Sequence, residues 1–158
     1  MSQFSGTHLN KVDSKGRVSI PAPFRALLRA QREIDDGSPE APLFLRRSNF
    51  HDCLEAWSER GFQGFTSRLS QLDRLSPEYD DIATAIFSDA YRMETDKEGR
   101  IVLPGDLAQF AGITGPVAFM GVGEYFQIWE PDAAARRREE ARAKFLAAQR
   151  SRTTGGSA

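Results

Sequence analysis

A nine-residue motif occurs twice in this chain, and no other feature of the sequence constrains the fold as strongly. Residues 13–21 are Asp-Ser-Lys-Gly-Arg-Val-Ser-Ile-Pro, and residues 96–104 are Asp-Lys-Glu-Gly-Arg-Ile-Val-Leu-Pro, 83 positions later. We call these segments the first motif and the second motif. Self-similarity at a fixed offset is typical of a duplicated structural unit. The sequence therefore predicts two copies of one small module.

The similarity continues after each motif. Residues 42–45 resemble residues 116–119, and residues 53–57 resemble residues 125–129. The offset falls from 83 to 74 and then to 72, so the first copy must contain a longer loop, which residues 32–42 supply. Both motifs are also followed by apolar residues at helical spacing. These are Phe24, Leu27 and Leu28 in the first copy and Leu107, Phe110 and Ala111 in the second.

Each copy is expected to begin with a β-hairpin. Gly16 and Gly99 stand where a short hairpin loop favours a residue with positive φ. Asp13 and Asp96 can accept hydrogen bonds from the loop backbone. These four residues are the predicted turn-structuring residues. The predicted first strands are residues 7–12 and 91–95.

The remaining segments divide the chain around these modules. The first module is predicted to span residues 7–57 and the second residues 89–132, with a helical connection over residues 58–88. A C-terminal helix over residues 133–150 and a disordered tail over residues 151–158 follow.

The connection is predicted to contain two helices. The second of them should begin at Ser76 and Pro77, a capping residue followed by a proline suited to the first turn. The first should bury an apolar stripe at helical spacing. That stripe consists of Phe62, Phe65, Leu69, Leu72 and Leu75.

The duplication also predicts how the halves combine. Two hairpins and a helix cannot readily close a core alone, because a small sheet leaves open edges. Two copies related by a pseudo-two-fold axis can supply each other's missing edges. The predicted fold is therefore mainly β with added helices, of the α+β class, in which both halves form one barrel-like unit.

Charge distinguishes the two copies, although the net charge of the chain is only −1. Residues 1–32 carry a net +5 and residues 132–152 a net +4, whereas residues 33–131 carry −10. The first motif thus lies in a basic segment and the second in an acidic one. The clearest differences between the copies are Lys11 against Glu94 and Lys15 against Glu98.

The doubled motif, the Pro-Ala-x-Phe-Arg sequence of residues 21–25 and the chain length resemble the MraZ family, within the AbrB-like group of bacterial DNA-binding regulators. The similarity extends over residues 6–130. It implies a double-split β-barrel formed from two halves of the SpoVT-AbrB type. It also implies a transcription regulator of the division and cell-wall gene cluster. Such a regulator binds short G-rich direct repeats upstream of its own operon as a ring-like homo-oligomer.

The resemblance associates the arginine of the motif with DNA, which here is Arg17, with Arg100 as its equivalent. A two-stranded ribbon fits the major groove, and an arginine can hold guanine O6 and N7 with two hydrogen bonds. Lys11 and Lys15 could neutralise phosphates beside Arg17. Arg100 and Lys97 are weaker members of the predicted DNA-binding set, because the second motif is acidic.

Alternative roles remain open for these and other arginines. Asp13 and Arg17 could pair across the turn and only stabilise it, although an aspartate can also fix an arginine whose remaining donors face DNA. A different class of function is also open, an AbrB-like assembly or antitoxin-type module that binds a protein partner. The other arginines could contact phosphates, form a solvated face or, in the tail, contact another subunit. They are Arg25, Arg29 and Arg32 on the first helix and Arg136, Arg137 and Arg138 in the tail.

The sequence gives little support to an enzyme. Two histidines and one cysteine cannot supply a four-ligand zinc site by themselves, and no phosphate-binding or dinucleotide-binding glycine motif is present. A hydrolase using His51 and Cys53 is a third hypothesis, but on a strand these residues would lie about 6.6 Å apart. Cys53 is therefore expected to be a small buried residue. The aromatic residues expected in the core are Phe44, Phe50, Trp57, Phe119, Phe126 and Trp129.

These observations complete the prediction of function. We expect no catalytic residue, no metal, no cofactor and no small-molecule substrate. The expected partners are double-stranded DNA and other copies of the chain. A single cysteine fits a reducing compartment, and no apolar run approaches the roughly 20 residues that cross a membrane. A cytoplasmic, nucleoid-associated protein is therefore expected.

Overall fold

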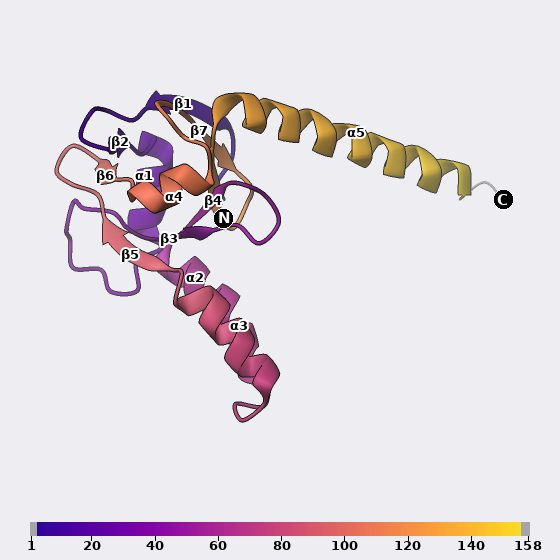
Figure 1. The fold of residues 1–158 in the computed structure, drawn as a ribbon, viewed down its shortest axis with the longest axis horizontal. Helices are drawn as coiled ribbons and strands as arrows, with labels where there is room; N and C mark the ends of the chain where they lie inside the picture. Colours follow the sequence, from indigo (N-terminus) through magenta and orange to yellow (C-terminus); the bar gives the residue numbers. More distant parts are fainter. Residues whose placement is uncertain (1–2, 156–158) are drawn as a thin grey trace.

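The computed structural model describes the backbone of residues 3–155, and the order of its elements repeats once along the chain (Figure 1). The strands are β1 (Thr7–Lys11), β2 (Arg17–Ser19), β3 (Pro42–Arg47), β4 (Leu54–Trp57), β5 (Tyr91–Glu94), β6 (Arg100–Val102), β7 (Pro116–Gly121) and β8 (Phe126–Trp129). The helices are α1 (Ala22–Ala30), α2 (Glu59–Ser67), the 3-10 turn η1 (Arg68–Gln71), α3 (Pro77–Phe87), α4 (Gly105–Phe110) and α5 (Pro131–Gly155). The predicted α+β class, dominated by antiparallel sheet, is confirmed.

The strand pairing is symmetric under exchange of the two copies. Six strands form one antiparallel sheet in the order β1-β7-β8-β4-β3-β5, and β2 and β6 form a separate ribbon. Replacing each of β1–β4 by its equivalent in β5–β8 reproduces every pairing, including its register. Lys11 lies opposite Pro116, for example, and its equivalent Glu94 lies opposite Pro42. The offsets found in the sequence are thus the structural offsets of the repeat.

The hairpin prediction is correct for the turns and wrong for the strands beside them. The backbone of each turn closes on itself, with Asp13 N donating to Arg17 O at 2.9 Å and Asp96 N to Arg100 O at 2.8 Å. Beyond the turn, however, β1 pairs with β7 and β2 pairs with β6, so the two arms of each expected hairpin separate. Each copy therefore supplies strands to the other, as the open-edge argument predicted.

The main core lies inside the curved sheet, between its inner face, the ribbon, α1 and α4. It includes the fully buried Val18, Phe24, Leu45, Leu107 and Phe126. The helical spacings that follow the two motifs place Phe24 and Leu107 in this core, which confirms α1 and α4. The strand order gives a six-stranded sheet and a ribbon, and closure into a double-split barrel stays a prediction.

Helices cover the outer faces of the sheet, and α2, η1 and α3 form an arm on the first half (Figure 1). Ser76 caps α3 by accepting a hydrogen bond from Tyr79 N, as predicted. The first predicted helix is shorter than expected, since it ends as a 3-10 turn and its stripe stops at Leu72. Leu75 is 92% exposed, because it lies in the turn before α3 rather than on a helix.

The C-terminal helix is longer than predicted. It begins at Pro131 rather than at residue 133 and continues to Gly155, so a disordered tail is wrong for residues 151–155. Alanine, arginine and lysine favour helix over residues 133–150, whereas the added last turn, residues 151–155, is Ser-Arg-Thr-Thr-Gly and has no such preference. The rest of the predicted tail, residues 156–158, lies outside the described residues. Among the helices described, none is both long and apolar enough to span a bilayer.

The helices α2 and α5 are themselves equivalent. Trp57 and Trp129 are 72 positions apart, and the same offset separates the first residues of α2 and α5. Both helices are capped by the preceding side chain: Ser58 accepts from Gly61 N, and Glu130 accepts from Asp132 N and Ala133 N. The repeat therefore extends one helix beyond the fourth strand of each copy.

A buried ion pair distinguishes the two outer faces. On the first half, Arg46 Nη1 lies 2.8 Å from Glu55 Oε1, which also accepts a hydrogen bond from Trp57 Nε1 at 3.1 Å. Arg46 and Glu55 are 1% and 4% exposed. In the second half, Trp129 Nε1 donates to Gln127 Oε1 at 2.8 Å, so the same tryptophan contact is made without a charge.

The three arginines predicted on the first helix hold neighbouring segments, so a solvated face is the wrong interpretation for them; Arg25 and Arg29 lie on α1, and Arg32 follows its end. Arg32 forms an ion pair with Asp35 at 3.0 Å and donates to Ser38 O, which fixes the inserted loop of the first copy. Arg25 donates to Ile20 O and covers the glycine of the second turn. Arg29 donates to Pro39 O at 3.4 Å.

Candidate nucleic-acid interface

The β2–β6 ribbon has one buried face and one outward face. Val18 lies opposite Ile101, and these side chains are only 1% and 3% exposed in the core. Because side chains alternate along a strand, the other positions of the ribbon point away from the core. Arg17 lies opposite Val102 and Arg100 opposite Ser19, so the two motif arginines share the outward face on a diagonal.

Each turn fixes the orientation of its arginine. Asp13 Oδ1 accepts hydrogen bonds from the backbone of Lys15 and Arg17, both at 2.9 Å, and its Oδ2 accepts from Arg17 Nε at 2.8 Å. Gly16 has φ +79°, the left-handed conformation that glycine adopts without strain. The aspartate therefore accepts hydrogen bonds from both the loop backbone and the arginine side chain, and a turn-structuring role for Asp13 and Gly16 stays a prediction.

The second turn repeats this geometry. Asp96 Oδ1 accepts from the backbone of Glu98 and Arg100, and its Oδ2 from Arg100 Nε at 3.2 Å, while Gly99 has φ +81°. The backbone N–H of Arg100 is the main cause that lowers the pKa of Asp96, and the backbone N–H of Arg17 does the same for the pKa of Asp13. Both carboxylates are therefore stabilised in the charged form that fixes the arginines.

The two arginines differ in what occupies their terminal nitrogens. Arg100 Nη2 lies 2.9 Å from Glu98 Oε2, so a second carboxylate engages its guanidinium. The position of Glu98 is taken by Lys15 in the first turn. Among residues 3–155, the recorded ion pair of Arg17 is with Asp13 through Nε alone. Arg17 can thus present both Nη atoms to an outside acceptor, whereas Arg100 is partly neutralised.

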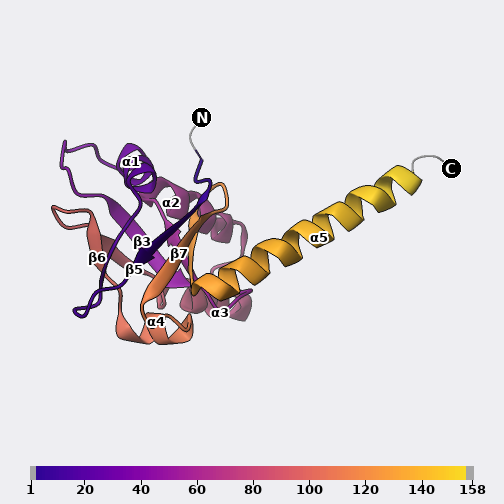
Figure 2. The ribbon, with the colours of Figure 1, turned by 90° about the horizontal axis from the view of Figure 1, so that it is seen from above.

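The predicted lysines lie near these arginines on the surface. Lys11 ends β1, Lys15 and Lys97 lie in the two turns, and all three side chains are exposed. Both turns project from the side of the body opposite to the direction of α5 (Figures 1 and 2). The structure therefore brings all five predicted DNA-binding residues to one side of the molecule, and their contact with DNA stays a prediction.

Sequence reasoning missed three residues that shape this surface. Val102 is 62% exposed on the outward face beside Arg17. Asn10 Nδ2 donates to Ser19 O at 2.7 Å and links β1 to the ribbon. Arg25 lies against Gly99, where an added Cβ would stand 2.6 Å from its Nε. The positions of Val102 and Arg25 have no signal in the local sequence, because each depends on segments that the strand exchange brings together. The Asn10 contact lies within the first copy, between β1 and β2.

The geometry gives no support to the hydrolase hypothesis. Cys53 is fully buried, and burial raises the pKa of its thiol to about 12, so it is not a ready nucleophile. Across the described part of the chain, no group of three histidine, cysteine or acidic side chains is placed to hold a metal ion. Phe50 was expected in the core but is 81% exposed, since it lies in the loop after β3.

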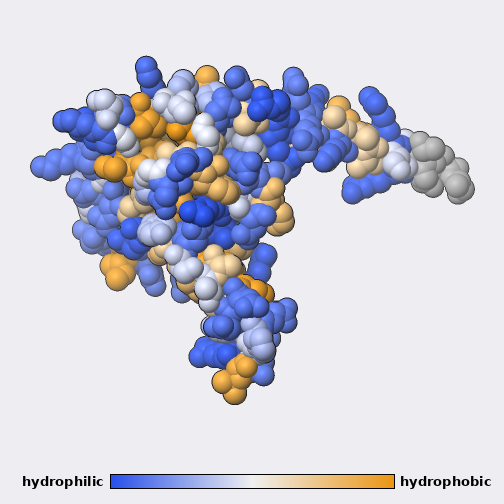
Figure 3. Space-filling view, viewed as in Figure 1, coloured by the Kyte–Doolittle hydropathy of each residue, from blue (hydrophilic) through white to orange (hydrophobic). Residues whose placement is uncertain are grey.

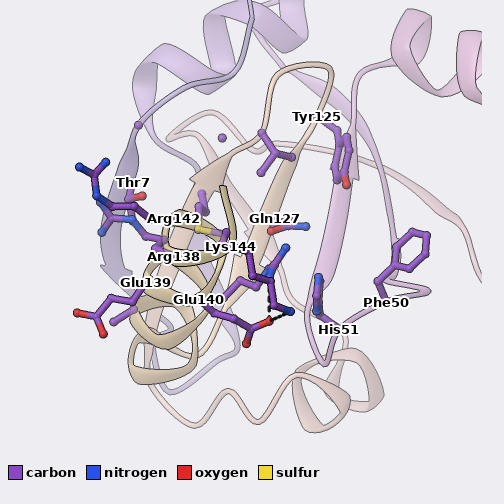
Figure 4. Close-up of a pocket in the computed structure, with 17 residues that line it drawn as sticks. Thr7, Phe50, His51, Tyr125, Gln127, Arg138, Glu139, Glu140, Arg142 and Lys144 are labelled. Atoms are coloured by element: carbon purple, nitrogen blue, oxygen red, sulfur yellow. Dashed lines mark hydrogen bonds and ion pairs between the residues drawn. The ribbon is translucent and has the colours of Figure 1, made fainter. Parts of the chain in front are cut away.

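A large cleft lies apart from the ribbon. It has a volume of about 1240 Å³ and lies between the start of α5 and the outer face of the sheet (Figure 4). His51, Tyr125 and Gln127 line one wall, and Arg138 and Glu140 of α5 line the other. A Glu140–Lys144 ion pair of 3.0 Å lies on the α5 side. The lining is charged and open, without a buried nucleophile.

The fold and the ribbon define a class of protein: a single chain with two interleaved copies of a β-rich module, each presenting an aspartate-fixed arginine. Comparison with known proteins agrees with this class. Residues 86–155 match the family model described as "MraZ protein, putative antitoxin-like".

Curated relatives extend the match over most of the chain. A protein of Gluconacetobacter diazotrophicus named transcriptional regulator MraZ is 51% identical over 144 residues, which are 91% of this chain and 89% of the relative. Proteins of the same name from Gluconobacter oxydans and Parvibaculum lavamentivorans are 47% and 39% identical, over 91% and 85% of this chain and 85% and 80% of the relatives. The chain belongs to the MraZ family.

Proposed function

We propose that this protein is a sequence-specific DNA-binding transcription regulator whose first motif contacts the bases. The observation that carries the proposal is the unequal setting of the two arginines. Arg17 is held by Asp13 through Nε, with the exposed Lys11 and Lys15 on the same segment, whereas Arg100 is also engaged by Glu98 through Nη2. The names of the relatives, which are transcriptional regulators, support the same function.

In this proposal the outward face of the ribbon enters the major groove. A two-stranded ribbon is narrow enough to do so, and Arg17 would donate from both Nη atoms to guanine O6 and N7. Lys11 and Lys15 would contact phosphates, which set affinity and salt dependence rather than base preference. Glu94 and Glu98 place negative charge beside the second turn, which would repel phosphates there.

One ribbon reading one short site would bind weakly, so the proposal includes a ring-like homo-oligomer. Several linked ribbons raise avidity without any new contact, provided that their spacing matches the spacing of the sites. The resemblance to the family suggests the targets, which are short G-rich direct repeats upstream of the protein's own operon in the division and cell-wall gene cluster. The protein would then act on the chromosome in the cytoplasm.

A matched pair of variants tests the proposal. Binding of the full chain to duplexes with G-rich direct repeats is titrated for wild type, Arg17→Ala and Arg100→Ala. We expect Arg17→Ala to lower affinity by about 5- to 150-fold, since a bidentate arginine contributes about 1–3 kcal/mol of discrimination. Arg100→Ala should change affinity much less. Equal affinity of Arg17→Ala and wild type at moderate salt would refute the assignment of the first motif.

A second candidate function is an antitoxin-type module that binds a protein partner, which the description of the matching family model favours. The same titration separates the two. A DNA-binding regulator loses affinity as salt rises and prefers G-rich repeats over a scrambled duplex of equal length. A module that binds only a protein partner would show neither effect.

A further inference from the structure

The internal repeat leaves one helix without the cover that its equivalent has. In the first half, α2 packs against α3 through a cluster that includes Phe62, Phe65 and Ile86. In the second half, α5 begins at the equivalent position, and Ala134 in its first turn is buried against the sheet. Beyond that turn the helix extends away from the body (Figures 1 and 2). The distal half of α5 therefore lacks a neighbour within the described chain.

The face of α5 that packs on the sheet continues into this distal half. Ala134, Ala141, Phe145 and Ala148 follow at spacings of 7, 4 and 3, which place them on one side of a helix. Ala134 is 2% exposed, but Phe145 is 61% exposed. The space-filling view shows apolar surface partway along an otherwise hydrophilic rod (Figure 3). We call Ala141, Phe145 and Ala148 the α5 stripe.

Charge limits what can cover this stripe. After Glu140 every charged residue of the helix is basic, and these are Arg142, Lys144, Arg150 and Arg152. A second α5 packed against the first would bring like charges together, which is unfavourable. The cover is therefore expected to be acidic and to contain an exposed apolar residue.

The outward face of α3 has both properties. Tyr79, Ile82 and Ile86 point inward to the cluster with α2, so the residues on the opposite side of the helix face solvent. This outer face of α3 consists of Asp80, Asp81 and Thr84, with Phe87 at its edge, where the ring also packs edge-on against Phe62 of α2 at 6.0 Å. Phe87 is 48% exposed, and the recorded ion pairs of residues 3–155 include neither aspartate.

We propose that the α5 stripe docks on the outer face of α3 in a second copy of this chain. Phe145 would pack beside Phe87 with the two helices antiparallel, which brings Arg152 near Asp80 and Asp81, and Arg142 would add positive charge on the other side of Phe145. Since α5 and α3 are different surfaces, the contact is heterologous: each copy offers α5 to one neighbour and α3 to the other, which generates a ring when the rotation closes. The inference rests on the homo-oligomer of the proposed function and identifies its interface.

Charge reversal tests the contact. Arg142→Glu/Arg152→Glu and Asp80→Lys/Asp81→Lys should each lose the assembly and run at the mass of a single chain in light scattering after size exclusion. Mixing the two variants should restore the assembly, because each altered surface then meets a complementary one in alternating order. Restoration also shows that both variants are folded. Assembly by either variant alone at the wild-type mass would overturn the proposal.

A crosslinking experiment remains decisive even if a reversed variant fails to fold. Thr84→Cys/Ala148→Cys places one thiol on each surface at exposed positions, and the native Cys53 is buried. Mild oxidation should give a ladder of covalent multimers on a non-reducing gel. Ala148→Cys alone should remain monomeric on that gel. Dimers from Ala148→Cys alone would mean that α5 contacts α5, and an absence of the ladder would contradict the docking.

DNA binding separates this inference from the proposed function. A charge-reversed variant should bind a duplex with one repeat as wild type does, and should lose the gain in affinity that wild type shows on several repeats. If Arg17→Ala binds normally while the assembly behaves as proposed, only the DNA-reading role fails. If the assembly is unaffected while Arg17→Ala loses DNA binding, only the interface fails.

Discussion

The Nη2 atom of Arg100 lies 2.9 Å from Oε2 of Glu98, whereas the residue beside Arg17 at the equivalent position is Lys15. The backbone of the two turns is otherwise the same, down to the aspartate that holds each arginine. A single carboxylate therefore separates an arginine that can bind an outside acceptor from one that is already engaged.

Glu98→Lys should accordingly convert the second turn into a DNA-contacting one. The variant releases Arg100 and adds a lysine, so affinity for DNA should rise and the salt dependence should steepen by about one unit of log–log slope for each added phosphate contact. Binding titrations over a range of salt concentrations measure both quantities. Glu98→Lys/Arg100→Ala is the control, and an unchanged slope in Glu98→Lys would show that the second turn lies away from DNA.

Breaking the buried Arg46–Glu55 pair should lower the free energy of unfolding strongly, and residues taken from the second copy should restore it. Glu55→Gln leaves the buried charge of Arg46 uncompensated, which typically costs about 3–5 kcal/mol. The second copy has Met120 and Gln127 at the equivalent positions. Arg46→Met/Glu55→Gln should therefore recover most of the loss, as measured by denaturant unfolding. A double variant as unstable as Glu55→Gln would show that the first half needs this charge for packing.

The two turn glycines should respond differently to alanine. Gly16→Ala places a side chain at positive φ, where its Cβ would make only ordinary contacts, 3.8 Å from Leu103 O, and should cost about 1–2 kcal/mol. Gly99→Ala also displaces Arg25, which loses its hydrogen bond to Ile20 O, so the free energy of unfolding should fall further. In an Arg25→Ala background the cost of Gly99→Ala should approach that of Gly16→Ala. Persistence of the full difference there would exclude Arg25 as its cause.

The turn aspartates predict a specific loss of stability in acid. Folding lowers the pKa of Asp13 and Asp96 below the ordinary value of 3.8. A group with a lowered folded pKa contributes stability above its unfolded pKa and loses that contribution as the pH falls through the folded pKa. Asp13→Asn/Asp96→Asn should therefore have a lower Tm than wild type at neutral pH. The difference in Tm between wild type and this variant should shrink as the pH falls below 3.8. A difference that stays constant with pH would mean that the charge of the aspartates does not contribute and that only the geometry of their hydrogen bonds matters.

Much of this fold follows from the repeat in the sequence. The offsets of 83, 74 and 72 are the offsets of the strand registers, and the helix after each motif buries the residues that its spacing selects. The exchange of strands between copies is different, because a turn such as residues 13–17 closes in the same way whether or not its arms pair. Which strand each arm pairs with depends on competition between distant strands, and the local sequence contains no information about that competition.

In the candidate site, too, the local features could be predicted from the sequence and the long-range contacts could not. Asp13, Gly16 and Arg17 act within five consecutive residues, so their geometry could be predicted from the motif. The contact of Arg25 with Gly99 joins positions that are far apart in sequence, and nothing in the pattern of α1 distinguishes Arg25 from Arg29. The prediction that Phe50 lies in the core failed for a related reason. The sequence around an aromatic residue near the end of a strand does not show whether the residue is in the core or in the following loop.

Under the proposed function, the fusion of both copies in one chain has a consequence for the symmetry of the DNA sequence that it would bind. Two identical chains that exchanged strands in this way would have to carry the same residues in both turns, and their symmetry would be matched by a palindrome. Joined end to end, the copies can diverge, and here one turn is basic and the other acidic. The two ends of the binding surface are then different, so the surface is not symmetric about the two-fold axis. An asymmetric surface would suit DNA sequences that repeat head to tail along the duplex.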